Sequence, residues 1–172
     1  MSLPISARKQ SERPTGGGAG FSVIELLIVV AIILIIAAIA IPNILRARIA
    51  ANQADAVENC RTVTSAQVVY YTAYAKGFAA TLSTLSGPPN APPTSANAQL
   101  IDNALASGQK SGYAFTYVPL APDPSGNPQN YALNADPLIP GISGVNHYFT
   151  NEPSVIHVNI LAAASANDPG IQ

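Results

Sequence analysis

One long apolar run near the N-terminus constrains the fold of this chain more than any other feature. No polar side chain occurs from Leu26 to Ile41, and the five residues before that run contain only two, Ser22 and Glu25. A helix rises about 1.5 Å per residue, so residues 21–41 would extend roughly 31 Å, close to the thickness of a bilayer's hydrocarbon core. We therefore expect a helix here that can span a membrane.

Glu25 does not suit a simple membrane anchor. A carboxylate inside hydrocarbon costs on the order of 3 kcal/mol on insertion scales, so an anchor would be more stable with leucine at this position. An ionisable residue within a membrane span is by default a candidate functional residue. Glu25 is therefore the first candidate site residue of the chain.

Residues 1–20, ahead of the apolar run, are basic, lack apolar periodicity and end in a glycine-rich stretch. Such a segment cannot bury enough surface to order itself. A secretory signal has a shorter apolar core, and its small-residue cleavage site follows that core. Here the glycines precede the apolar run, so a cut there would leave the hydrophobic helix at the new N-terminus. We interpret residues 1–20 as a cleaved leader.

The charges around the apolar run favour a cytoplasmic N-terminus only weakly. Arg8, Lys9 and Arg13 precede the run, and basic residues tend to stay in the cytoplasm. Arg46 and Arg48 follow the run on its other side and weaken this bias. Charge alone therefore does not decide the orientation in the membrane.

The sequence from Gly20 to Glu25, GFSVIE, resembles the processing site of type IV prepilins and pseudopilins. The resemblance implies that a prepilin peptidase cuts between Gly20 and Phe21 and methylates the new amine of Phe21. It matches Glu25 to the family's glutamate, the fifth residue after the cut. Pro42 matches the proline that bends the family's long helix. The resemblance is strongest over residues 20 to about 60.

The resemblance also implies a role and partners. It implies a structural subunit held in the inner membrane before assembly, which then associates with itself into a helical filament, an extracellular pilus. An inner-membrane assembly platform would act on it, and the amine of Phe21 would pair with Glu25 of a neighbouring subunit. No cofactor and no enzymatic activity are expected. Without the leader, 5 basic and 8 acidic residues would remain.

Beyond Pro42, residues 43–76 are expected to continue the helix as an amphipathic half. Small or apolar residues recur there at steps of three and four, which is typical of one helix face. The predicted face that packs on a soluble domain consists of Ala50, Ala54, Val57, Cys60, Thr64, Val68, Tyr71 and Ala75. Gly77 is a natural stop for this helix.

Residues 77–172 are expected to form a globular head. The prolines near residues 87–93 exclude regular structure, and residues 96–106 are a candidate short helix. Alternating patterns predict strands at 113–118, 130–135, 145–150 and 155–160, followed by a frayed tail from residue 162. The predicted fold is α+β and pilin-like, with a long bent N-terminal helix packed on a small antiparallel sheet of three or four strands.

Few residues in the chain point to other chemistry. The charges, 8 basic against 9 acidic, form no basic patch for nucleic acid. Cys60 is the only cysteine, so no intrachain disulfide can form, and a small buried residue is expected in preference to interchain pairing or reactivity. His147 and His157 lack a carboxylate cluster, and Asp123 and Asp136 are too sparse for a calcium loop. We therefore predict no metal site.

The clustered tyrosines Tyr70, Tyr71 and Tyr74 are expected to pack on the sheet, with a subunit contact or a stacking surface for charge transfer as the alternatives. Three other functions stay open for the whole chain. One is a pseudopilin of a type II secretion system, which uses the same processing. The others are a membrane-anchored periplasmic binding module and, least favoured, a membrane-anchored enzyme, for which the sequence offers no catalytic constellation.

Overall fold

The computed structural model describes residues 20–171. The predicted leader, apart from Gly20, lies outside the described residues. The chain divides into two compact units, with the boundary between Ala40 and Ile41. This boundary lies within two residues of Pro42, where the sequence predicts the change from the apolar to the amphipathic half of the helix.

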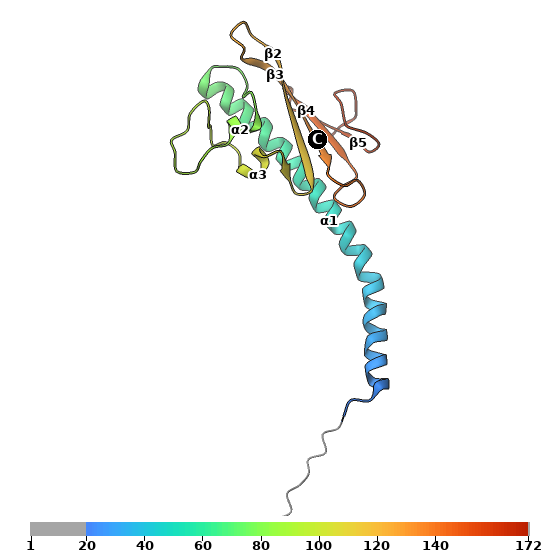
Figure 1. Cartoon of the computed structure of the whole chain (residues 1–172). Coiled ribbons are helices and arrows are strands. Elements are labelled where there is room, and N and C mark those ends of the chain that lie inside the picture. The colour runs from blue at the N-terminus through green and yellow to red at the C-terminus, as the bar shows by residue number, and fades with distance from the viewer. Residues whose placement is uncertain (1–19, 172) are drawn as a thin grey trace, which may run out of the picture. The chain divides into compact units, whose positions relative to one another are not determined.

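Helix α1 runs from Val23 to Tyr74 and continues through Pro42 (Figure 1). It ends close to the predicted stop, because Ala75 and Gly77 both adopt positive φ angles of 51° and 76°. Gly77 has a second reason to be glycine. A Cβ there would lie 2.2 Å from the carbonyl oxygen of Pro128, so the chain can turn toward the sheet only with glycine at this position.

The buried face of α1 differs from the predicted one. The buried residues are Ala56, Asn59, Cys60, Val63, Thr64, Ala66, Gln67 and Tyr70. Only Cys60 and Thr64 belong to both faces, so the true face is rotated by about one residue, roughly 100° around a helix of 3.6 residues per turn. Val68 and Tyr71, predicted to face the core, are exposed. Alanine and valine occur on several sides of this helix, so hydrophobicity alone did not identify the buried side.

The sheet has six antiparallel strands, and each strand pairs with the next along the chain. The strands are β1 Gln109–Lys110, β2 Tyr113–Pro122, β3 Pro128–Pro137, β4 His147–Asn151, β5 Ile156–Asn159 and β6 Gly170–Ile171 (Figure 1). The four longer strands are those that the sequence predicts, and β1 and β6 are two-residue additions at the sheet edges. The α+β fold, with a long helix on an antiparallel sheet, is confirmed.

The core lies between the second half of α1 and one face of the sheet. Inward residues alternate along β2 and β3, as a two-residue strand period requires, and β4 and β5 contribute to the same face. The fully buried sheet residues include Tyr113, Leu133 and Ala135, which join Cys60 and Val63 of the helix in one cluster.

The segment between α1 and the sheet contains two four-residue helices, α2 Leu82–Leu85 and α3 Asn103–Ala106. Each begins at a side-chain cap, Thr81 or Asp102. The predicted helix over residues 96–106 is therefore wrong except at its end. Gln99 has a positive φ of 55°, and its neighbours donate backbone hydrogen bonds to residues 84–86 instead of forming helical turns.

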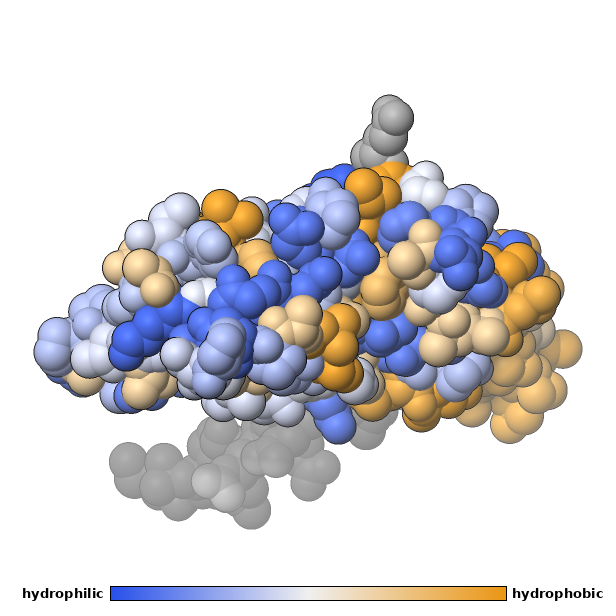
Figure 2. All heavy atoms as spheres, turned by 90° about the horizontal axis from the view of Figure 1, so that it is seen from above, coloured by the Kyte–Doolittle hydropathy of each residue, from blue (hydrophilic) through white to orange (hydrophobic). Residues whose placement is uncertain are grey.

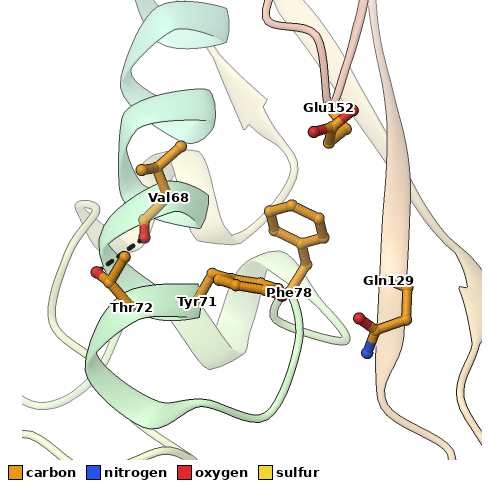
Figure 3. Close-up of a pocket in the computed structure, with 6 residues that line it drawn as sticks. All are labelled: Val68, Tyr71, Thr72, Phe78, Gln129 and Glu152. Carbon is orange, nitrogen blue, oxygen red and sulfur yellow. Dashed lines mark hydrogen bonds between the residues drawn. The ribbon is translucent and has the colours of Figure 1, made fainter.

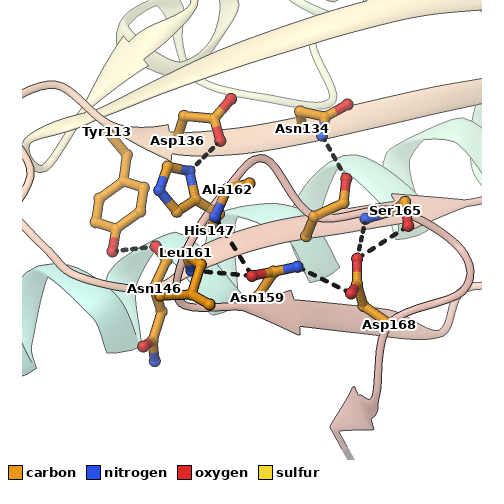
Figure 4. Close-up of polar contacts among 11 residues, drawn as sticks. Tyr113, Asn134, Asp136, Asn146, His147, Asn159, Leu161, Ala162, Ser165 and Asp168 are labelled. Carbon is orange, nitrogen blue, oxygen red and sulfur yellow. Dashed lines mark hydrogen bonds and ion pairs between the residues drawn. The ribbon is translucent and has the colours of Figure 1, made fainter.

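Residues 162–171 are held by turns and by strand pairing, contrary to the prediction of fraying. Strand β6 pairs with β5, with Ile171 opposite Ile156. The loop between them is held by Asp168, whose carboxylate accepts hydrogen bonds from the Ser165 amide at 2.7 Å and from the Asn159 side chain at 2.9 Å (Figure 4). These hydrogen bonds lower the pKa of Asp168, the Ser165 amide contributing most. Side-chain hydrogen bonds thus hold this loop closed in a chain whose single cysteine cannot form an intrachain disulfide.

A buried glutamine joins the helix to the sheet and to the start of the head. Gln67 is fully buried, and its side-chain amide oxygen accepts a hydrogen bond from the backbone N–H of Ala79 at 2.8 Å. Its amide nitrogen donates to the Tyr117 hydroxyl at 2.8 Å. Because both polar ends of the side chain are satisfied, the face of α1 that contains Gln67 can be buried without an uncompensated desolvation cost.

We predict that Gln67→Leu destabilises the head by about 1–3 kcal/mol, because the buried N–H of Ala79 loses its acceptor. Urea unfolding of the full chain in detergent measures this change. Ser65→Ala, on the exposed side of the same helix, is the matched control and should stay within about 0.5 kcal/mol. Equal destabilisation by the two variants would contradict this role of Gln67.

Candidate functional site

The apolar start of α1 is the first candidate site. Among the described helices, α1 is long and apolar enough to cross a membrane, judged by length and composition, and its most apolar stretch is 0% buried. Ile24, Leu34 and Ile39 are each more than 60% exposed. By contrast, polar and small residues cover much of the head seen from above (Figure 2). Lipid or other protein must therefore cover the apolar segment.

The helix begins with a reciprocal pair of side-chain caps. The backbone N–H of Ser22 donates to the Glu25 carboxylate at 2.9 Å, and the N–H of Ile24 donates to the Ser22 hydroxyl at 3.3 Å. This arrangement is a capping box, in which the residues at the cap and at the third helical position each satisfy a free N–H. Glu25 also places negative charge near the positive end of the helix dipole.

The capping box is a role for Glu25 that the sequence analysis missed, although the Ser-x-x-Glu spacing signals it. The expected partner of Glu25, a free amine on Phe21, exists only after a cut, since in the uncut chain this nitrogen belongs to a peptide bond. The structure brings Glu25 to Ser22, the residue that follows Phe21. The predicted site residues Phe21 and Glu25 are therefore close neighbours.

Gly20 and Phe21, the predicted processing residues, precede the first helical residue, Val23. Both are exposed, Phe21 to 82%, and nothing lies within 4 Å of the position that a Cβ on Gly20 would take. The peptide bond between them is thus in exposed, non-helical backbone. A protease needs an accessible, non-helical bond of this kind.

Pro42 lies inside α1. Proline has no N–H, so it cannot donate the hydrogen bond that an ordinary residue would give to the carbonyl of Ala38. A bend of the helix near Pro42 stays a prediction. The boundary between the two units, at Ala40 and Ile41, lies beside the position where this helical hydrogen bond is missing.

A shallow pocket of about 340 Å³ lies between the end of α1 and the sheet (Figure 3). Its lining residues are Val68, Tyr71, Thr72, Phe78, Gln129 and Glu152. The rings of Tyr71 and Phe78 lie 5.2 Å apart, and Phe78 in turn contacts Tyr131 edge-on. Glu152 is the one carboxylate of this lining, and Tyr71 is its other titratable side chain.

The tyrosine cluster splits between core and surface. Tyr70 is buried and donates its hydroxyl to the carbonyl of Ser95 at 2.7 Å, and Tyr74 packs against it with the ring centroids 4.9 Å apart. Both rings pack in or against the core cluster, but the hydroxyl partner of Tyr70 belongs to the segment between α1 and the sheet and not to the predicted sheet. Tyr71 is exposed and lines the pocket instead, because it lies about 100° around the helix from the buried Tyr70, at the edge of the buried face.

The two histidines do not meet each other. His147 lies opposite Asn159, whereas His157 lies opposite Phe149. The Nδ1 atom of His147 is 2.6 Å from the Asp136 carboxylate, a carboxylate partner that the sequence analysis did not foresee (Figure 4). Each histidine is half-buried.

No cluster of three or more metal-ligating side chains occurs among residues 20–171. Asp123, considered for calcium, instead closes its own turn. Its carboxylate accepts hydrogen bonds from the backbone N–H groups of Ser125 at 2.8 Å and Asn127 at 2.9 Å. These hydrogen bonds, mainly the one from Asn127, lower the pKa of Asp123.

Cys60 lies in the centre of the core, as predicted for a small buried residue. It is fully buried on α1, and burial raises the pKa of its thiol to about 12. A thiol is nucleophilic as the thiolate, which this environment disfavours.

We therefore predict that Cys60 in the folded chain resists labelling by a thiol reagent at pH 8 and reacts fully after denaturation in urea. A colorimetric thiol assay on the full chain in detergent measures both states. A variant with cysteine at exposed Ser65 serves as the positive control for reagent access. Rapid labelling of native Cys60 would contradict its burial.

Comparison of the chain with protein-family models, with curated proteins and with solved structures found no match.

Proposed function

We propose that this chain is a structural subunit of a type IV pilus or a related pilus-like filament. The observation that carries the proposal is the exposed apolar start of α1, which begins at a capped Ser22–Glu25 turn directly after an accessible Gly20–Phe21 bond. An anchor alone needs the apolar surface but neither the glycine before it nor the carboxylate within it. A subunit that is cut and then polymerised uses all three.

In the proposed sequence of events, the precursor waits in the inner membrane with its apolar helix in lipid. A prepilin peptidase cuts after Gly20 and methylates the amine of Phe21. The capping box is retained, because Ser22 and Glu25 both follow the cut. An assembly platform then moves subunits from the membrane into an extracellular filament, where the apolar helices cover one another.

In this proposal, Glu25 sets the axial register between neighbouring subunits of the filament. The new cationic amine of Phe21 lies one residue from Ser22, whose N–H already contacts the Glu25 carboxylate at 2.9 Å. An amine from a neighbouring copy would compete for the same carboxylate within the apolar core. Opposite charges attract strongly at low dielectric, but desolvation offsets much of that gain. The pair therefore selects one axial offset between subunits more than it adds stability.

We predict that the mature chain in sheared surface filaments begins at Phe21 and carries a methyl group on its amine. Mass spectrometry of the N-terminal peptide measures both features. A Gly20→Arg variant, whose bulky charged side chain would obstruct the cut, should accumulate as uncut precursor and yield no filaments. Filaments built from chains that retain Met1, or chains cut after Ile41, would contradict the proposed processing.

Glu25 variants separate helix capping from charge pairing. We predict that Glu25→Gln keeps the capping box, because glutamine serves at the third helical position, yet assembles poorly without the charge. Glu25→Leu removes both functions and should assemble no better. Filament yield and N-terminal processing are measured for each variant, with Ser22→Ala as a control that weakens the cap alone. Normal filaments from Glu25→Gln would show that Glu25 acts only as a cap.

A further inference from the structure

The loop that joins β3 to β4 exposes an aliphatic surface on the head. Four of its side chains are exposed: Leu138 at 46%, Ile139 at 54%, Ile142 at 55% and Val145 at 43%. We name residues 138–145 the apolar loop. Single exposed aliphatic residues are common, but several within one short loop indicate a contact surface.

The apolar loop is held in one conformation by its own hydrogen bonds. The Ile139 N–H donates to the Ser143 hydroxyl at 3.0 Å, and the Ser143 N–H donates to the Ile139 carbonyl at 2.9 Å. The Gly141 N–H donates to the Gly144 carbonyl at 2.8 Å. A loop that is ordered before it binds pays less conformational entropy on association.

The same loop is fastened to α1 and to the sheet. The side-chain amide of Asn52 donates to the Ser143 carbonyl at 2.8 Å. Gln53, with its amide oriented to suit the local donors, accepts from the backbone N–H of Val145 at 3.1 Å. Gly144 lies directly against Tyr113, since a Cβ there would come within 2.2 Å of the tyrosine hydroxyl. The fold thus presents the aliphatic side chains on a rigid support.

Lipid is a poor occupant for this surface. The apolar run ends at Ile41, and Asn52, the attachment point of the loop, is eleven residues further along α1. At about 1.5 Å per residue, the two lie about 16 Å apart along the helix axis. The headgroup region of a bilayer extends only about 5–8 Å beyond each side of the hydrocarbon core. The loop would therefore lie in water while the chain is held in the membrane.

A second copy of this chain offers a matching surface. The start of α1 is also aliphatic, and none of its most apolar stretch is buried. If copies stack in parallel, the apolar loop, which is attached at Asn52, lies beside residues 21–41 of a copy that is shifted by 11 to 31 residues. The smallest of these shifts, 11 residues, corresponds to roughly 17 Å along the helix.

We propose that the apolar loop of one copy packs on the apolar start of α1 of a second copy in the filament. This inference rests on the proposed function and names a contact between the head of one subunit and the helix of another. The two surfaces differ, so the contact is heterologous and propagates into an open fibre instead of closing as a symmetric dimer.

The first test places a charge on the loop. Ile142→Asp should reduce the yield of sheared filaments at least about tenfold, because a carboxylate would be buried against an aliphatic surface. Leu161→Asp is the matched control, because Leu161 is 89% exposed on a different loop and should assemble normally. Both variants should keep the melting temperature and N-terminal processing of the unaltered chain, because both sites are exposed.

Normal filament yield from Ile142→Asp, or an equal loss from Leu161→Asp, would overturn the inference and leave the proposed function intact. A failure of the unaltered chain to form filaments would overturn the proposed function, and this inference with it. The two failures are therefore distinguishable.

The second test identifies the occupant. An Ile142→Cys variant should react with a water-soluble maleimide in membranes that hold the precursor, and should be protected in filaments. Protection already in the membrane would identify lipid as the occupant and overturn the proposal. Buried Cys60 does not compete for the reagent.

The third test identifies the contacting helix. Ile142→Cys combined in turn with Val29→Cys, Ile33→Cys or Ile36→Cys should give oxidised ladders of cross-linked subunits in filaments. Leu161→Cys with the same partners should give none. The absence of ladders from all three Ile142 combinations would overturn the proposal.

Discussion

The apolar surface at the start of α1 is the constraint on which the rest of this protein depends. The surface is aliphatic, continuous along the helix and 0% buried over its most apolar stretch. Exposure of such a surface to water is unfavourable, because burying each Å² of apolar surface lowers the free energy by about 25 cal/mol. The chain must therefore place this segment in lipid or against protein. The proposed subunit, which moves from a membrane to a filament, would use the two environments in turn.

Helix α1 is continuous from the apolar segment, which has to be covered, into the core of the head. The same helix that exposes its apolar start supplies Cys60, Val63 and Gln67 to the core of the second unit. The head therefore folds on the helix, and a contact made by the apolar segment is covalently continuous with the head's own core. The rigid attachment of the apolar loop at Asn52 follows the same principle, because it places a second aliphatic surface directly on this helix.

Glu25 combines a local role with a proposed intermolecular one. As part of the capping box, its carboxylate satisfies a backbone N–H that would otherwise be left unpaired at the start of the helix. This hydrogen bond offsets part of the cost of a carboxylate near hydrocarbon. The pairing with the amine of a neighbour would then exchange one charge-assisted contact for another, which is consistent with selecting a register and not with a large gain in stability.

The sequence by itself determined the elements whose patterns are long and local. The apolar run and Gly77 set the extent of α1, and the alternation in residues 113–118 and 130–135 predicted β2 and β3, because helix and strand periods are visible along the chain.

Tertiary structure decided where the short helices and strands form and which face of α1 is buried. Strands β1 and β6 and helices α2 and α3 are too short to show a period. The side of α1 that is buried depends on Gln67, which reaches Ala79 and Tyr117. The position of the apolar loop was likewise decided by tertiary contacts, among them those of Asn52 with Ser143 and of Gly144 with Tyr113. The buried face of α1 and the position of the apolar loop depend on hydrogen bonds between residues distant in sequence, and such partners leave no periodic signal in the sequence.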